Sequence, residues 1–337
     1  MMGSPFVTVV APAFNESANL RALYYRIRDV LEASNYLFEV VIVDNGSTDD
    51  SLAILKGLHR IDPRLKYVSL SRNFGHQGGL IAGLEHGMGD IVISMDADLQ
   101  HPPELIPELI ARWQEGFDVV HTTKRRDMAS GPMRRWLGEA FYGLLGRLSG
   151  MDMAASRSDF RLYSRRVLDM LCSLPERQKF IRGLVCWLGF NQTAVEYDLA
   201  PRLHGESKFR YRHLFSLAFE AILSFSIVPL RILSALGLSL SLLSILYALY
   251  LAAAGIYALK SGNYQHLPPG WATIAVSIIF FGGIQLLSMG LIGEYLGRVY
   301  DETKRRPIYV VREAVTTSSL KEADFGEGRL VSKSGTQ

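Results

Sequence analysis

Two aspartates one residue apart, Asp96 and Asp98, end an apolar run in the segment VISMDADLQHPPE, residues 92–104. Gln100 follows them closely. Carboxylate and amide oxygens are the ligands that hard cations such as Mg²⁺ and Mn²⁺ prefer. A cation held by Asp96, Asp98 and Gln100 would bridge the two phosphates of a nucleoside diphosphate and neutralise its charge as it leaves. Because aspartates also cap helices, the surrounding elements must decide between these roles.

A further carboxylate, Asp44, ends the apolar run FEVVIVD. At the end of a strand it could accept the N3–H of a uracil ring, which would select uridine over cytidine. The alternative is a turn-stabilising role, which the segment DNGSTDD also suits. The sequence has no GxxxxGK[ST] motif, and no GxGxxG follows the first apolar run, so P-loop and dinucleotide sites are weak interpretations.

The elements that position these residues follow a strand–helix rhythm. Five short apolar runs, FVTVVA, FEVVIVD, KYVSLS, DIVISMD and FDVVHT, are typical of strands, and helical patterns such as residues 17–34 lie between them. This pattern predicts an α/β domain with a mostly parallel sheet covered on both faces. The polar motifs PAFNES, DNGSTDD, SRNFGHQGG and MDADLQ follow the first four strands, where such sheets bind their ligands.

Two long uncharged runs change the composition in the C-terminal third of the 337-residue chain. Residues 232–259 and 271–293 contain no charged side chain, and each run exceeds the roughly 20 residues that a helix needs to cross a bilayer. We therefore predict a transmembrane hairpin. Basic residues lie before the first span and after the second, at Arg231, Arg298 and residues 304–306, so both termini are expected on the cytoplasmic side.

Other compositional features narrow the class of protein. The N-terminus lacks the pattern of a signal peptide, so the first 206 residues are expected in the cytoplasm. Cys172 and Cys186 have no metal-site spacing and are expected as reduced thiols. A net charge of +3 is too small to indicate a nucleic-acid partner, and its clustering beside apolar helices favours an anionic lipid surface.

Domain boundaries follow from these patterns. Residues 208–226 can form an amphipathic helix lying in the membrane interface, and the tail from about residue 315 is polar and predicted to be disordered. Small residues in the second span, Gly282, Gly283 and Ser288, would allow close helix contact in a homo-oligomer. The predicted parts are a ligand-binding domain at 1–206, an interfacial helix at 207–227, transmembrane helices at 228–259 and 271–297, and a partly disordered cytoplasmic tail at 298–337.

Seven motifs give the sequence a close resemblance to a known family. They are PAFNES, VDNGSTDDS, SRNFGHQGG, MDADLQHPPE, SDFRLYSRR, HGESKF and GEYLGRVYDETKRRPIYVV. Together they resemble the inverting polyprenyl-phosphate glycosyltransferases related to dolichol-phosphate mannose synthase, and especially the bacterial two-span bactoprenol glucosyltransferases. The resemblance covers roughly residues 5 to 312 and implies a GT-A, Rossmann-like fold. Asn45 departs from the family pattern, which often has a second aspartate there, and little effect is expected.

The resemblance implies transfer of a sugar, with glucose as the best guess, from a UDP-sugar to a polyprenyl (undecaprenyl) phosphate at the inner membrane of a bacterial cell. Asp159 matches the family's acidic residue near the reaction centre, and the resemblance leaves open whether it orients the acceptor or the sugar or acts as a base. Because arginine suits phosphate, Arg125 and Arg135 are the candidates for the acceptor phosphate, with Arg126 and Arg134 as alternatives. The implied donor-binding residues, besides the metal ligand Asp98, are Pro12, Asn15, Glu16, Asp44, Ser47, Asp96, Arg202, Ser207 and Lys208.

Several alternatives stay open at this point. The donor could carry N-acetylglucosamine or formamido-arabinose, or be GDP-mannose. A processive polysaccharide synthase is disfavoured because two helices cannot easily form a polymer channel and the QxxRW motif is absent. A lipid-linked sugar flippase or a non-catalytic membrane scaffold would not need the intact DxD and arginine motifs. A glycosidase is weaker still, because Asp96 and Asp98 lie too close in sequence to flank a glycosidic bond.

Overall fold

The computed structural model describes residues 4–124, 158–176, 179–197, 228–261 and 270–316. Several predicted site residues lie outside these ranges: Arg125, Arg126, Arg134, Arg135, Arg202, Ser207 and Lys208. The same holds for the predicted interfacial helix. The described residues form two compact units, one made of residues 4–197 with 306–316 and the other of residues 228–261 with 270–305.

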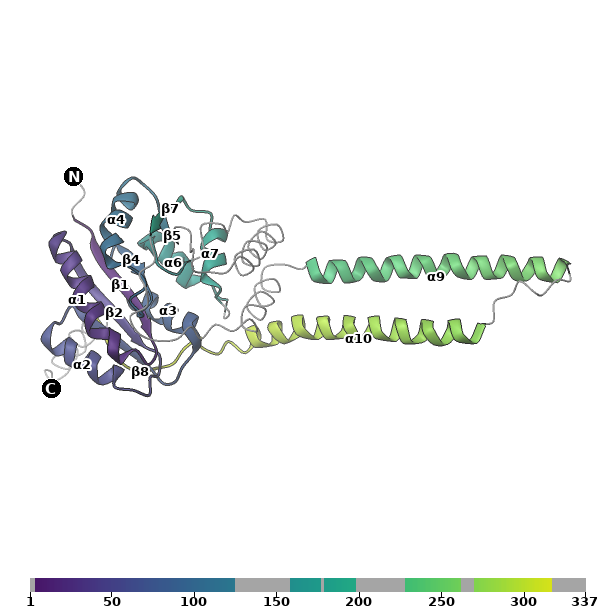
Figure 1. Ribbon diagram of the computed structural model, residues 1–337, viewed down its shortest axis with the longest axis horizontal. Helices are drawn as coiled ribbons and strands as arrows, with labels where there is room; N and C mark the ends of the chain where they lie inside the picture. Colours follow the sequence, from purple (N-terminus) through teal and green to yellow (C-terminus); the bar gives the residue numbers. More distant parts are fainter. Residues whose placement is uncertain (1–3, 125–157, 177–178, 198–227, 262–269, 317–337) are drawn as a thin grey trace, which may run out of the picture. The chain divides into compact units, whose positions relative to one another are not determined.

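The first unit is a mixed α/β domain built on one eight-stranded sheet with the order β7-β5-β6-β4-β1-β2-β3-β8 (Figure 1). Most neighbouring strands are parallel, whereas β6 is antiparallel to both of its neighbours and β8 is antiparallel to β3. The strands are β1 Phe6–Ala13, β2 Leu37–Asp44, β3 Leu65–Leu70, β4 Ile91–Ser94, β5 Val119–Lys124, β6 Arg161–Ser164, β7 Gln192–Tyr197 and β8 Val311–Val315.

Helices cover both faces of this sheet, as its continuous apolar strands require. Helices α1, α2 and α4 line one face, and α3, α6 and α7 form a second group against the other. The short helix η1, Pro103–Leu105, precedes α4. The helices are α1 Ser17–Ala33, α2 Ser51–Ile61, α3 Gly75–His86, α4 Ile106–Gln114, α6 Arg165–Ser173 and α7 Ile181–Trp187.

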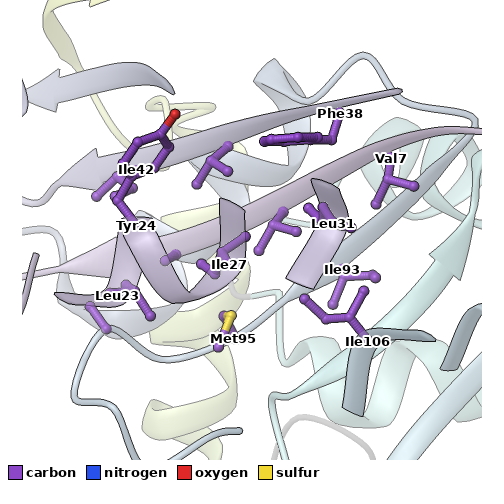
Figure 2. Packing of buried hydrophobic residues seen from close by; sticks show 14 of the residues in the cluster. Val7, Leu23, Tyr24, Ile27, Leu31, Phe38, Ile42, Ile93, Met95 and Ile106 are labelled. Carbon is purple, nitrogen blue, oxygen red and sulfur yellow. The ribbon is translucent and has the colours of Figure 1, made fainter. Parts of the chain in front are cut away.

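The hydrophobic core lies between the sheet and α1. Leu23, Ile27 and Leu31 of α1 recur at helical spacing and pack with strand residues such as Ile42 and Ile93, all of them fully buried (Figure 2). Burying an aliphatic side chain of this size contributes roughly 1.5–3 kcal/mol. The core therefore holds β1, β2 and β4 at fixed register, so the loops that follow them start from fixed positions.

On the opposite face, α3 packs unusually close to the strands. A Cβ at Gly83 would lie 2.2 Å from Val10 Cγ1, and one at Gly79 would lie 3.2 Å from Asn45 Nδ2 and from Pro12 Cβ. The glycine-rich segment GHQGG therefore serves close helix–strand packing, and it sets the N-terminal end of α3 against the ends of β1 and β2.

Strand β8 was not anticipated from the sequence, which predicted only a partly disordered tail from residue 298. Val311–Val315 pairs with β3, and Glu313 lies opposite Ser69. Side-chain contacts reinforce this pairing: Lys56 Nζ lies 2.5 Å from Glu313 Oε1, and the hydroxyl of Tyr309 donates to Glu85. The segment after α10 is therefore an integral part of the first unit.

The second unit consists of two long helices that contact each other, α9 Val228–Ser261 and α10 Gly270–Thr303. Each helix contains one of the uncharged runs. Within the part of the chain that the structure describes, no helix combines the length and the hydropathy needed to cross a membrane. The transmembrane prediction is thus not confirmed.

Candidate active site

The polar motifs converge at the carboxyl ends of the central strands. Ala13, Asp44 and Ser69 lie side by side at the ends of β1, β2 and β3, and Ser94 ends β4 opposite Val10 of β1. Two groups of residues meet at this end of the sheet. The β2 edge comprises Asn15, Asp44, Asn45, Ser47 and Ser69, and the β4 edge comprises His76, Asp96, Asp98, Asp159 and Arg182.

Asp44 is the centre of the β2 edge. Its carboxylate is buried and accepts hydrogen bonds from the backbone N–H of Ser47 at 3.0 Å and from the hydroxyl of Ser69 at 2.8 Å. The turn-stabilising role considered from the sequence is therefore present. A carboxylate has about four lone-pair sites, so these two bonds do not exhaust its capacity to accept a ring N–H. The uracil-binding role of Asp44 stays a prediction.

The loop after β1 is tied to the loop after β2. Asn15 has a left-handed backbone, with φ of 56°, its N–H donates to Ser47 Oγ at 3.0 Å, and its Oδ1 accepts the N–H of Thr48 at 2.9 Å. The N–H of Glu16 donates to Ser51 Oγ at 3.2 Å. The structure thus brings together Asn15, Glu16 and Ser47, which were predicted to bind the sugar donor, beside Asp44. Pro12 lies next to them in β1.

Asn45 connects the β2 edge to the loop before α3. Its Nδ2 donates to the carbonyl of Gly75 at 2.8 Å, and its Oδ1 accepts the N–H of Phe74 at 3.0 Å. An aspartate at this position could accept the second bond but could not donate the first. The amide therefore has its own structural function here, beyond what the sequence comparison with the family pattern suggested.

Asp96 and Asp98 lie in a tight turn directly after β4. Leu99 between Asp98 and Gln100 has a φ of 62°, and Asp98 Oδ1 accepts the N–H of Gln100 at 3.1 Å. The Asp96 side chain is 36% exposed, and its Oδ1 lies 3.7 Å from Nε2 of His76. The two carboxylates therefore stand at the rim of the sheet.

The residues of this turn suit a cation that is shared with a substrate. Among the described residues, no group of three or more histidine, cysteine, aspartate or glutamate side chains is arranged to hold a metal ion alone. Mg²⁺ is usually bound by one or two carboxylates, with substrate phosphates and waters as the other ligands. The hard oxygen set of Asp96, Asp98 and Gln100 fits that mode.

His101 fixes the conformation of the turn. Its Nδ1 accepts the N–H of Asp96 at 3.0 Å, and its buried ring stacks on Phe160 with centroids 5.1 Å apart. It also lies edge-on to Tyr197, at 6.1 Å. These contacts give His101 a structural role in the turn.

Asp159 is held by charged partners from two other elements. Arg182 of α7 binds it with two hydrogen bonds, Nε to Oδ1 at 2.9 Å and Nη2 to Oδ2 at 2.7 Å, and His76 Nε2 of α3 lies 3.2 Å from Oδ2. Asp159 is 5% exposed. Burial raises the pKa of this carboxyl, but Arg182 and then His76 outweigh it and hold the pKa well below its usual range.

His76 joins Asp159 to the DxD turn, because its Nε2 faces both Asp159 and Asp96. Desolvation lowers the pKa of His76. The hydrogen bond to Asp159 and the charges of Asp96 and Asp159 raise it by a larger amount, so the net shift of the pKa is upward. The β4 edge thus links acidic and basic side chains drawn from residues 76 to 182.

Two members of this array were missed or undervalued from the sequence. Arg182 was not identified, although a single arginine within the apolar segment FIRGLV is a signal of a buried charge partner. His76 was not among the predicted site residues, and the structure places it between Asp96 and Asp159. Arg182 lies outside the seven motifs, whereas His76 lies within SRNFGHQGG.

Comparisons with known proteins identify the relatives of this chain. The model of the family described as "Glycosyl transferase family 2" matches residues 8–171. An uncharacterized glycosyltransferase of Synechocystis sp. is 40% identical over 91% of this chain and 95% of its own. A prophage-derived bactoprenol glucosyl transferase of Shigella flexneri is 39% identical over 91% of this chain and 98% of its own.

Among solved structures, glucosyl-3-phosphoglycerate synthase from Mycobacterium tuberculosis, in complex with Mn²⁺, UDP-glucose and phosphoglyceric acid, is similar at lower identity. It is 21% identical, covers 65% of this chain and 78% of its own, and has a TM-score of 0.45.

Proposed function

The chain belongs to glycosyl transferase family 2, and from this premise we propose that it transfers a sugar from a UDP-sugar to a polyprenyl phosphate. One observation carries the proposal: bactoprenol glucosyl transferases are 39% identical to this chain over nearly their whole length. Glucose is accordingly the favoured sugar, and undecaprenyl phosphate the favoured acceptor. The product would be a polyprenyl-phosphate sugar for glycosylation of the cell envelope.

The geometry of the site supports this chemistry. Asp44 on the β2 edge offers an acceptor for the uracil ring, and the DxD turn lies at the end of β4, which pairs with the neighbouring strand β1. A base bound at the first edge would place its diphosphate toward the second. Asp96, Asp98 and Gln100 would hold Mg²⁺ or Mn²⁺ there. When bound, the cation supplies positive charge to the leaving UDP.

The reaction itself asks little of the protein in proton transfer. A phosphate monoester is largely ionised near neutral pH, so its oxygen can attack the anomeric carbon without a base. Attack from the face opposite UDP inverts that carbon: a C–O bond forms to the lipid phosphate, and the bond to UDP breaks. The protein must instead bring two anions together, which is the proposed task of Arg125 and Arg135, with Arg202, Ser207 and Lys208 at the donor diphosphate.

Membrane attachment through α9 and α10 is part of the proposal. The two uncharged runs support it, and so do the large apolar side chains that both helices expose, such as Leu243, Leu249, Ile278 and Leu286, which are 62–73% exposed. We place the catalytic domain and both termini on the cytoplasmic face of the bacterial inner membrane, with about residues 260–270 outside. A homo-oligomer stays a prediction.

A donor panel tests the transfer. The purified full-length chain is incubated with undecaprenyl phosphate and, in turn, UDP-glucose, UDP-N-acetylglucosamine, UDP-formamido-arabinose and GDP-mannose, and the lipid product is identified by mass spectrometry. We expect a product with UDP-glucose. A product with another donor would change the sugar but not the class of reaction. The absence of lipid-linked sugar with every donor would favour a flippase or a scaffold.

Cysteine labelling tests the topology. In a chain whose two native cysteines are replaced with serine, a membrane-impermeant reagent added outside the cell should label Asn263→Cys. It should not label Asp29→Cys, although the Asp29 side chain is 63% exposed on α1. The reverse pattern would place the catalytic domain on the wrong side for a cytoplasmic UDP-sugar.

A further inference from the structure

Arg182 and Asp159 form the strongest charge pair of the β4 edge. The pair is bidentate, with the two bonds of 2.9 and 2.7 Å described above, and it joins the start of α7 to the loop before β6. Two parallel bonds fix the orientation of a carboxylate as well as its position. Arg182 is 24% exposed in its side chain and Asp159 5% exposed, so water competes little for this contact.

The same carboxylate carries the connection onward to the DxD turn. Asp159 Oδ2 faces His76, and His76 in turn faces Asp96 at 3.7 Å. In addition, the hydroxyl of Ser94, the last residue of β4, donates to the backbone carbonyl of Asp159. Movement of Asp159 would therefore shift both a side chain and a strand end that border Asp96.

We infer that Arg182 is a positioning residue for sugar transfer, which orients the Asp159 carboxylate and, through it, His76 beside the DxD turn. This inference rests on the proposed function. In it Asp159 remains ionised and serves to orient its neighbours, and it does not remove a proton from the acceptor. The bidentate pairing with Arg182 supports this role, because a guanidinium bound to both oxygens stabilises the ionised carboxylate and so weakens it as a proton acceptor.

A positioning role and a purely structural role of this ion pair predict different kinetics. A structural pair would affect stability and leave the turnover of the folded enzyme unchanged. A positioning pair affects kcat, because a displacement of about 1 Å near the reaction centre can cost about a hundredfold in rate. It leaves the KM values nearly unchanged, because Arg182 is not assigned a contact with either substrate.

The experiment compares Arg182→Gln, Arg182→Lys, Asp159→Asn and the double variant Arg182→Gln/Asp159→Asn with the wild type. Arg112→Met is the matched control, since Arg112 is an exposed arginine of α4 that pairs with Glu115 at 3.0 Å. Each full-length variant is assayed with UDP-glucose and undecaprenyl phosphate, and kcat and both KM values are measured. Melting temperatures report whether each variant folds.

For Arg182→Gln we expect a loss of about a hundredfold in kcat with both KM values within about threefold of the wild type. Arg182→Lys should lose roughly tenfold, because an ammonium group keeps the charge but lacks the planar fork. The double variant should be no slower than Asp159→Asn alone, since residues that act as one unit are non-additive. Arg112→Met should match the wild type.

Three outcomes would overturn the inference. If Arg182→Gln raises a KM at normal kcat, Arg182 is a substrate-binding residue. If the loss of kcat in the double variant is the product of the two single losses, the residues act independently, and if Arg182→Gln folds with normal kcat, the pair is structural. If Arg182→Gln does not fold, Arg182→Lys provides the test. A wild-type kcat in Arg182→Lys would contradict the inference, because it would show that the planar guanidinium is not required. A wild type that transfers no sugar would instead remove the proposed function itself.

Discussion

The β2 edge and the β4 edge end the same sheet but are held together by different forces. Asp44, Asn15 and Asn45 bond to backbone groups and serine hydroxyls of adjacent loops. Asp159 and Asp96 instead face titratable or charged partners, His76 beside both and Arg182 beside Asp159. Hydrogen bonds of the first kind suit recognition of a flat, neutral ring, whereas a charged array of the second kind suits the handling of a diphosphate.

The difference predicts that the two edges fail in different ways. Damage to the β4 edge should lower the rate of transfer, because charge develops there during the reaction. Damage to the β2 edge should weaken donor binding and leave turnover nearly intact. The following predictions test this division, in order of decreasing effect.

The largest effect is expected from Asp98→Asn, which keeps the shape of the side chain and removes its charge. Loss of a group that stabilises developing charge typically costs 10²–10³-fold in kcat, so we expect a loss of roughly a thousandfold in transfer. Excess chelator should abolish transfer by the wild type, and added Mg²⁺ or Mn²⁺ should restore that activity. Full activity in chelator would exclude a cation at this turn and weaken the comparison.

The second effect concerns the pH dependence of stability beneath the β4 edge. His121 of β5 is fully buried, lies opposite Arg161 and contacts Gln192 at 2.7 Å. Burial, and then the charge of Arg161, lowers the pKa of His121 to about 4. The unfolded chain, with a histidine pKa of about 6.5, binds this proton more readily, so stability should fall as the pH drops from about 6.5 toward 4.

That loss amounts to about 3 kcal/mol, because one pKa unit corresponds to about 1.4 kcal/mol. His121→Leu should flatten the dependence within this window. The measurement is chemical unfolding of both chains at pH 7.5, 5.5 and 4.5. Equal losses in the two chains would show that other groups govern acid stability, and that the buried charge of Arg161 does not act on this histidine.

Asp44→Asn should affect the β2 edge alone. A hydrogen bond to a charged group typically contributes about 1.5–3 kcal/mol, so UDP affinity should fall by roughly ten- to a hundredfold. The preference for UDP over CDP should also shrink, while kcat changes little. Calorimetry with UDP and CDP gives the affinities, and steady-state assays give kcat. A large loss in kcat at normal UDP affinity would break the division between the edges.

The smallest effect is expected from Ser69→Ala, which removes the neutral hydroxyl that donates to Asp44 at 2.8 Å. Because this hydroxyl acts on UDP only by orienting Asp44, the fall in UDP affinity should be smaller than for Asp44→Asn, about fivefold. Ser173→Ala is a matched control, since that hydroxyl bonds only locally, to the carbonyl of Met170 in α6. An effect of Ser69→Ala as large as that of Asp44→Asn would mean that Asp44 acts solely through its hydroxyl partner.

Much of the fold was predictable because its signals are local. The first five strands, the helices between them and the position of the motifs after the strands follow from apolar periodicity alone. Strands β6, β7 and β8 were not predicted. RLYS has only four residues, and VREAV carries two charged residues, so neither has a strong apolar pattern. They are strands because β4, β5 and β3 offer them hydrogen-bonding partners.

The sequence by itself determined the turn after Asp44, the DxD turn and the two uncharged runs, because each depends on residues close together in the chain. Asp44 bonds to Ser47 three residues later, and Asp98 to Gln100 two residues later. Only the tertiary structure decided that Asp159 meets His76, 83 residues away, and Arg182, 23 residues away. Charged contacts of this kind have no sequence period, since they form only when the core brings α3, β6 and α7 to one end of the sheet.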